Sequence, residues 1–348
     1  MNKKSMFGKF LLACLFVVGV VSCSDGDEEV IIPDSLGKGV FILNEGSFGM
    51  NNASLSFVEK SDGSEYFDLM DGTLGETAQD MLIYGSRLYI AVYGSQYISV
   101  VDAYSKKELK KISFENSGPR YLTVHGGNVY ASIYNGYVAC IDTLDLGVKA
   151  MVEVGSNPEG IAVLNNKLYV AITNAMDYSN VDNKVAVVDL SSFTKTGTIE
   201  VNMNPYYLQA DASGYLYVSS QDVWSADFST IVSSGKLQRI DTNDGNRVED
   251  VRESMVLKYV LAGNDCYYFD YSGVGVLNLT TKESKEFITD GTQIGTPYGI
   301  GLDPVSKELY LSGTDYQNPG KVYVFGQDGK KKQAYSVGIN PNGFAFYY

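Results

Sequence analysis

The amino-acid sequence predicts an all-β protein, a seven-bladed β-propeller with four strands in each blade. Strand signals continue through the chain: Val, Ile, Tyr and Leu alternate with polar residues between Gly, Asn, Asp and Ser, and no long segment has a helical period. A tyrosine-rich strand recurs seven times at the spacing of a propeller blade. Each end of the chain carries half of one repeat, so the C-terminal strand is expected to complete the first blade and close the ring.

The tyrosine-rich strand is the clearest element of each repeat, as in LYVA at residues 168–171. Its copies lie at residues 40–43, 88–91, 129–132, 168–171, 216–219, 266–269 and 309–312. An innermost strand precedes it, as at residues 121–126. A third strand that often ends in aspartate follows, as at residues 187–190, and a short outer strand comes last, as at residues 197–201. Seven such repeats occupy residues 37–348, which indicates one domain.

The two ends of the chain indicate how the ring closes. The last nine residues, NPNGFAFYY, match NPEGIAVLN at residues 157–165 and, more weakly, NPYYLQADA at residues 204–212. The tyrosine-rich strand follows the internal copies, whereas the chain stops after the last one. GKGVFILNEG at residues 37–46 is such a strand with no innermost strand before it. We therefore expect residues 344–348 to form the innermost strand of the first blade.

The N-terminus predicts a lipoprotein signal peptide at residues 1–22. Three lysines precede an apolar run too short for a comfortable membrane span, and VVSC ends in Cys23, the expected lipidation site. An acidic linker, residues 23–36, would follow, and SDGDEE within it resembles a surface-export tag. The alternatives are an ordinary secretory signal with an incidental cysteine and a plain solvated linker. The lipid would be the only membrane attachment, on the extracellular face of an outer membrane.

Charge and cysteine content exclude several classes of function. Without the three lysines of the signal, 24 basic residues face 41 acidic ones, a net charge of −17. This balance argues against nucleic-acid binding, which needs a basic surface. Cys140 and Cys266 fall in strands of different repeats with no CxxC spacing, so both are expected to be buried thiols.

Candidate binding residues gather where the innermost strands begin and where the tyrosine-rich strands end, because both positions face one mouth of the central channel. They are Gln79, Arg120, Glu159, Tyr206, Leu257, Tyr298 and Asn342, with Asp80, Tyr121 and Tyr207 beside them, and Tyr93, Tyr134, Asn135, Asn174, Gln221 and Tyr271 at the strand ends. Long loops at residues 173–183 and 220–235, the second with Trp224, lie on the same face. This set suits a large, flat ligand rich in amides or hydroxyls. The alternative is that several tyrosines only pack between blades.

The sequence offers no catalytic signature. Its single histidine, His125, is expected in a surface turn. One histidine in such a position excludes a metal site built from histidine ligands and a Ser–His–Asp triad. Asp177 with Asp182, or Asp222 with Asp227, could bind calcium, but loop solvation is the simpler interpretation. A metal-dependent lactonase would need convergent carboxylates at the channel mouth, where only Glu159 and Asp80 qualify. We therefore expect a binding protein with no cofactor and no metal site.

The chain resembles the YncE-like surface propeller lipoproteins of Bacteroidota, and within them the BtuG-type cobalamin-capturing lipoproteins. The stretches that carry the resemblance are residues 43–57 (LNEGSFGMNNASLSF), 75–95, 118–142, 154–163 (VGSNPEGIAV) and 187–208. It implies capture of cobalamin or a related corrinoid and delivery to a TonB-dependent outer-membrane transporter. It also implies that Tyr93, Arg120, Tyr121, Tyr134 and Asn135 engage the corrin ring, with Tyr206, Tyr207, Trp224 and Tyr298 as an aromatic wall. The resemblance is weakest in blades 5 and 6, at residues 220–235 and 255–263.

Other functions stay open at this point. The same scaffold could capture a glycan or a siderophore, because tyrosine and tryptophan faces also stack on sugars. A metal-dependent lactonase and a purely structural surface role are the remaining hypotheses. Each predicts a different ligand, and the structural role predicts none.

Overall fold

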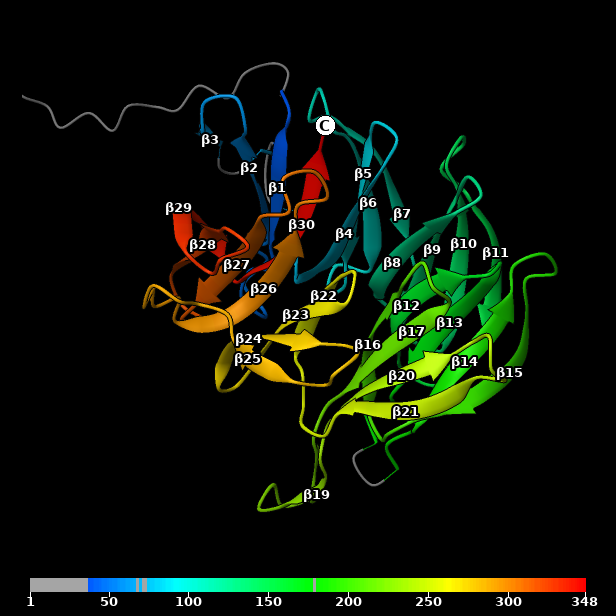
Figure 1. Cartoon of the computed structure of the whole chain (residues 1–348). Coiled ribbons are helices and arrows are strands. Elements are labelled where there is room, and N and C mark those ends of the chain that lie inside the picture. The colour runs from blue at the N-terminus through cyan, green and yellow to red at the C-terminus, as the bar shows by residue number, and fades with distance from the viewer. Residues whose placement is uncertain (1–36, 67–68, 71–73, 178–179) are drawn as a thin grey trace, which may run out of the picture. The chain divides into compact units, whose positions relative to one another are not determined.

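The computed structural model describes residues 37–348 except 67–68, 71–73 and 178–179, and it confirms the predicted fold. Seven four-stranded antiparallel sheets form a ring (Figure 1). Within the described ranges all regular elements are strands. The same ranges contain no helix that is long and apolar enough to cross a membrane. The predicted signal peptide, Cys23 and the acidic linker lie outside the described residues.

Blades are numbered along the chain, and the strands of each are given from the channel outward. Blade 1 consists of β30 (Pro341–Tyr347), β1 (Gly39–Asn44), β2 (Ser54–Glu59) and β3 (Glu65–Tyr66). Blade 2 consists of β4 (Ala78–Tyr84), β5 (Arg87–Val92), β6 (Tyr97–Asp102) and β7 (Glu108–Ser113). Blade 3 consists of β8 (Pro119–His125), β9 (Asn128–Ile133), β10 (Tyr137–Asp142) and β11 (Val148–Glu153). Blade 4 consists of β12 (Pro158–Leu164), β13 (Lys167–Ile172), β14 (Lys184–Asp189) and β15 (Thr194–Glu200).

The remaining blades depart from this regular pattern in their loops and outer strands. Blade 5 consists of β16 (Pro205–Ala210), β17 (Tyr215–Ser220), β20 (Leu237–Asp241) and β21 (Arg247–Arg252), and its long loop forms a separate hairpin, β18 (Val223–Trp224) with β19 (Ile231–Ser233). Blade 6 consists of β22 (Lys258–Ala262), β23 (Asp265–Asp270), β24 (Gly273–Asn278) and a short β25 (Ser284–Glu286). Blade 7 consists of β26 (Thr296–Leu302), β27 (Leu309–Thr314), β28 (Pro319–Phe325) and β29 (Lys331–Ile339).

The C-terminal strand closes the ring as the half-repeats predict. β1 pairs with β2 on one side and with β30 on the other, so Phe41 lies opposite both Phe57 and Ala345. Figure 1 shows β30, in red, beside β1, in blue. β30 also packs against β4 and β26, the innermost strands of its two neighbours. The first blade is therefore built from both ends of the chain.

The recurring Asn-Pro phrase marks the start of an innermost strand. Asn157, Asn204 and Asn340 have positive φ angles of 49°, 60° and 54°, a left-handed conformation that asparagine tolerates better than most residues. Each also accepts a hydrogen bond on its carbonyl oxygen from the end of the adjacent strand, as from the Gln221 amide at 3.0 Å and the Glu45 amide at 2.9 Å. The phrase therefore turns the chain into the channel and joins that turn to the neighbouring strand.

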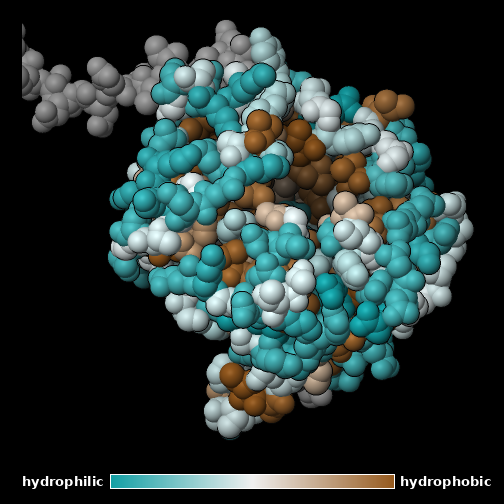
Figure 2. Space-filling view, in the orientation of Figure 1, coloured by the Kyte–Doolittle hydropathy of each residue, from teal (hydrophilic) through white to brown (hydrophobic). Residues whose placement is uncertain are grey.

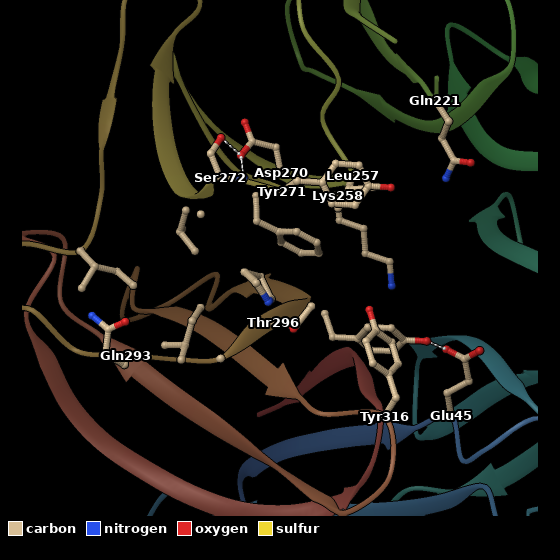
Figure 3. A pocket seen from close by; sticks show the side chains of 18 of the residues that line it. Glu45, Gln221, Leu257, Lys258, Asp270, Tyr271, Ser272, Gln293, Thr296 and Tyr316 are labelled. Carbon is tan, nitrogen blue, oxygen red and sulfur yellow. Dashed lines mark hydrogen bonds between the residues drawn. The ribbon is translucent and has the colours of Figure 1, made fainter. Parts of the chain in front are cut away.

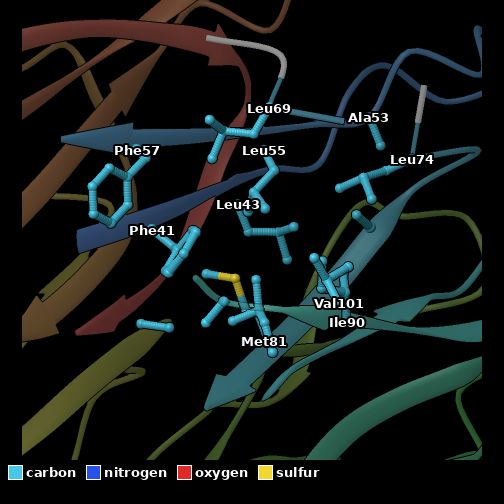
Figure 4. Packing of buried hydrophobic residues seen from close by; sticks show 14 of the residues in the cluster. Phe41, Leu43, Ala53, Leu55, Phe57, Leu69, Leu74, Met81, Ile90 and Val101 are labelled. Carbon is cyan, nitrogen blue, oxygen red and sulfur yellow. The ribbon is translucent and has the colours of Figure 1, made fainter. Parts of the chain in front are cut away.

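Hydrophobic clusters between neighbouring blades form the core. Figure 4 shows the cluster between blades 1 and 2, in which Phe41, Leu43 and Leu55 meet Met81 and Ile90. The Phe41 and Phe57 rings lie 4.7 Å apart. Each such fully buried side chain contributes about 1.5–3 kcal/mol.

Three smaller predictions can be compared with the structure. Cys140 and Cys266 are free and buried, as expected. His125 is exposed at the end of β8, also as expected.

A polar cluster joins blades 1 and 7 where the ring closes. The Lys60 ammonium pairs with Asp303 and donates to the Tyr348 hydroxyl at 2.6 Å, and that hydroxyl donates to Asp303. Asp303 is fully buried. Burial alone would raise its pKa, but the hydrogen bonds from Lys60 and Tyr348 hold the pKa well below its usual range. The ionised carboxylate therefore stabilises the closed ring.

We expect Asp303→Asn to destabilise the protein by about 2 kcal/mol at pH 7, because it leaves Lys60 without its buried partner. A depressed carboxyl pKa contributes stability above the unfolded value near 4, and that contribution is lost as pH falls. The difference in the free energy of unfolding between the variant and the parent should therefore become smaller below pH 4. Urea unfolding at pH 7 and pH 3.5 measures it, with Asp244→Asn on the exposed surface as control. An equal loss at both pH values would contradict this account.

Candidate functional site

A cavity of about 710 Å³ opens at one mouth of the central channel. Figure 2 shows one face of the protein, in the orientation of Figure 1; this face is hollowed near its middle, with hydrophobic residues inside the hollow. The walls come from the ends of the second strands and the starts of the innermost strands, which were predicted to meet there, and from the loop that follows β25. Its lining includes Glu45, Gln79, Tyr93, Arg120, Tyr206, Gln221, Leu257, Lys258, Phe269, Tyr271, Val274, Ile288, Ile294, Tyr298 and Tyr316.

Arg120 organises the wall formed by blades 2 to 5. Its Nε and Nη2 atoms donate to the Glu159 carboxylate at 2.8 and 3.0 Å, and Nη1 donates to Gln79 Oε1 at 2.9 Å. Nη2 also lies 3.5 Å from the Tyr206 hydroxyl. The guanidinium stacks 4.7 Å from the centre of the Tyr93 ring and 5.2 Å from that of Tyr134. Four of its five N–H groups are thus satisfied within the protein, which makes Arg120 a scaffold for the wall.

The Arg120–Glu159 pair is buried, with side chains 12% and 3% exposed. Burial raises the pKa of Glu159, and Arg120 offsets only part of this effect. Burial opposes the charge on Arg120 as well, but Glu159 and the neighbouring tyrosines hold the pKa of Arg120 above its ordinary value. Both pKa values are raised, but the shift of Glu159 favours its neutral form and the shift of Arg120 favours its charged form. The two-pronged geometry favours an ionised pair.

Tyr121 and Tyr207 lie deeper in the channel than the cavity. Their rings meet edge to face at 5.8 Å, and Tyr121 also packs against Tyr206 at 6.0 Å. Together with Asp80 they line a second cavity of about 380 Å³, formed farther along the innermost strands of blades 2 to 5. These two tyrosines therefore pack between blades, as the alternative interpretation allowed for some of them.

A second polar group forms where the ring closes. Asn342 is buried and donates from Nδ2 to Glu45 Oε2 at 3.2 Å and to the Ala78 carbonyl oxygen at 3.0 Å. Tyr298 donates its hydroxyl to the same Glu45 oxygen at 2.6 Å. Burial, and then the charge of Glu45, raise the pKa of Tyr298, so its hydroxyl stays protonated. Asn342 thus supports the cavity wall from behind.

Three further predicted residues do not line this cavity, besides Asp80, Tyr121, Tyr134, Glu159, Tyr207 and Asn342. Asn135 is exposed, and Asn174 donates to the Asn180 carbonyl oxygen within its own loop at 2.8 Å. Trp224 lies in the β18–β19 hairpin and is 43% exposed.

Sequence reasoning missed Glu45 and Lys258 as site residues. Glu45 follows the first strand directly, in a loop whose length gave the only signal. Lys258 stands at the position held by Tyr207 in blade 5, since each pairs with the equivalent residue of the next strand. It lies within residues 255–263, the segment that departs most from the repeat. That departure was the signal that could have identified it.

Among the residues that the structure describes, no group of three or more His, Cys, Asp or Glu side chains could hold a metal ion. Asp227 accepts hydrogen bonds from Ser225 and Ser229 in its own loop, which agrees with the simpler loop interpretation.

The fold and the cavity define the class of the protein: it is a seven-bladed propeller with a ligand-sized pocket at its channel mouth, which fits the YncE-like propellers. A family model described as a domain of unknown function, DUF5074, matches residues 38–346, and the chain belongs to this family. No curated protein matches the chain.

Solved structures similar to the chain show the same fold. A putative 6-phosphogluconolactonase from Bacteroides uniformis is 13% identical, with 89% of this chain and 100% of that chain covered and a TM-score of 0.63. Hydrazine synthase of Kuenenia stuttgartiensis is 17% identical, with 79% and 92% covered and a TM-score of 0.61. Apo AztD from Citrobacter koseri is 12% identical, with 88% and 97% covered and a TM-score of 0.57. At these identities the likeness concerns the fold alone.

We expect Arg120→Leu to lower the free energy of unfolding by about 3–5 kcal/mol, because it leaves the Glu159 carboxylate buried and unpaired. Adding Glu159→Gln should recover part of this loss. The exposed pair Lys149–Asp142 is the matched control, and Lys149→Leu should cost no more than about 1 kcal/mol. Urea unfolding of the single and double variants measures the coupling. Additive losses at Arg120 and Glu159 would contradict the pairing.

We expect Asp80→Asn to stabilise the protein at pH 8 and to have little effect at pH 4. Burial raises the pKa of Asp80 to about 6, although the Leu122 amide and Lys258 act in the other direction. Because the folded-state pKa exceeds the unfolded value near 4, the cost of ionising Asp80 builds up as pH rises from 4 to 6 and reaches about 3 kcal/mol at pH 8. Thermal unfolding across this pH range tests the prediction. A loss of stability at pH 8 would overturn it.

Proposed function

We propose that this protein binds a bulky small molecule at the channel mouth, and that cobalamin or a related corrinoid is the first candidate. The observation that carries the proposal is the cavity of about 710 Å³, within the range of small-molecule sites, where tyrosines and polar groups meet an apolar wall. Peripheral amides of a corrin would find donors and acceptors there. The sequence resemblance points to the same ligand, and to delivery to a TonB-dependent transporter by a lipid-anchored protein on the outer membrane.

Binding is a better proposal than catalysis. A lactonase would need Glu159 and Asp80 to converge on one metal ion. Glu159 is instead engaged by Arg120, while Asp80 lines the deeper cavity and accepts the Leu122 amide at 2.8 Å. Neither carboxylate faces the other across the mouth cavity.

A glycan or a siderophore is the second candidate. Tyr271 and Tyr316 line the cavity with 82% and 54% of their surface exposed. Exposed aromatic faces at a rim are suited to stacking on a sugar or a catecholate ring. This ligand would occupy the same cavity.

We expect cyanocobalamin to bind the purified protein with one-to-one stoichiometry in calorimetric titration, with cobinamide testing whether the lower base contributes. Tyr271→Ala should weaken binding about fivefold to tenfold, because it removes an aromatic contact at the rim. Tyr104→Ala, an exposed tyrosine in the turn between β6 and β7, is the control and should have no effect. Absence of binding by the folded protein would reject the corrinoid and direct the titration to glycans and siderophores.

A further inference from the structure

Lys258 is the cation of the cavity whose hydrogen bonds are least complete. It is the first residue of β22, and its Nζ atom donates to the Asn342 carbonyl oxygen at 2.9 Å. Within the described part of the chain, no carboxylate lies at ion-pair distance from it. An ammonium group has three donors, so two remain without a protein acceptor. Arg120, the other basic residue of the lining, is already satisfied by Glu159, Gln79 and Tyr206.

Glu45 has a carboxylate oxygen that is not used as a hydrogen-bond acceptor. Its Oε2 atom accepts hydrogen bonds from Tyr298 and Asn342, whereas no described residue donates to Oε1. Figure 3 shows Lys258 extending from one wall toward the opposite wall, where Tyr316 and Glu45 lie. The two side chains therefore border the same opening with unused donors on one side and an unused acceptor on the other.

The remaining charged residues of the lining do not share this property. Asp270 is paired with Arg252 at 2.8 Å and accepts the Ser272 hydroxyl at 2.6 Å, and Glu286 is exposed at the rim. Burial lowers the pKa of Lys258, while Glu45 and Asp80 favour its charged form. A ligand anion beside Lys258 would be repelled by the charge of Glu45, and a ligand cation beside Glu45 would be repelled by Lys258.

We propose that Lys258 and Glu45 together recognise a primary amide of the ligand, whose carbonyl oxygen accepts from Lys258 Nζ and whose N–H group donates to Glu45 Oε1. An amide supplies one acceptor and adjacent donors and carries no net charge. The apolar residues Leu257, Phe269 and Ile294 also line the cavity and would cover the carbon body that bears the amide. This inference rests on the proposed ligand-binding function and names the chemical group that the cavity selects.

The test uses 2-naphthamide and 2-naphthoate, which share an aromatic body and differ in the polar group. Their affinities for the purified protein are measured by fluorescence titration at pH 7.5. We expect the amide to bind at least fivefold more tightly than the carboxylate. Lys258→Met should weaken amide binding at least tenfold, and Lys110→Met, on exposed β7, should leave it unchanged. Glu45→Gln should remove or reverse the preference for the amide, an effect that a merely structural role would not produce.

Three results would overturn the inference: no binding of either probe, amide binding unchanged in Lys258→Met, or an unchanged preference in Glu45→Gln. Cyanocobalamin titration of the same variants distinguishes a failure of the amide-site inference from a failure of the corrinoid proposal. Selective naphthamide binding without corrinoid binding would support the amide site and reject the corrinoid. Corrinoid binding that is equal in the parent and Lys258→Met would reject the amide site and leave the corrinoid proposal in place.

Discussion

Closure of the ring by β30 is the constraint on which the other features of the structure depend. Seven sheets can bury their faces against one another only if the last blade meets the first, and the C-terminal strand provides that contact. The same strand also builds the site. Asn342 of β30 holds Glu45 through its amide and accepts Lys258 on its carbonyl oxygen. The polar end of the cavity therefore exists only when the two ends of the chain have paired.

The cavity lies where the repeat is least regular. Blades 2 to 5 surround the channel with the Arg120 network and with tyrosines that pack edge to face between their innermost strands. In blade 6 a lysine takes the place of such a tyrosine, and the outer strand β25 is only three residues long. The chain from Glu286 to Tyr298 then forms a wall of the cavity. A symmetric scaffold thus acquires one asymmetric pocket through local departures from its own pattern.

The fold could be predicted from the sequence because its signals are repeated. Seven copies of one strand and two half-repeats at the ends determine the blade number and the closure, and errors in any single copy do not matter. The site was predicted only in part. Gln79, Tyr93, Arg120, Tyr206 and Tyr298 do line the cavity, since repeat alignment locates the start of each innermost strand. Alignment cannot tell which equivalent side chains point into the cavity and which pack below it, as Tyr121 and Tyr207 do. Nor can alignment find Glu45 or Lys258, because each differs from the residues at the equivalent positions of the other blades.

Hydrogen–deuterium exchange of the purified protein with and without cyanocobalamin tests most directly whether the channel-mouth cavity, on the side of blades 6 and 7, is the binding site. The account predicts slower exchange in residues 256–274 and 286–298, with little change in the outer strands β7, β11 and β15. Protection confined to another part of the ring, or to the opposite face, would contradict it.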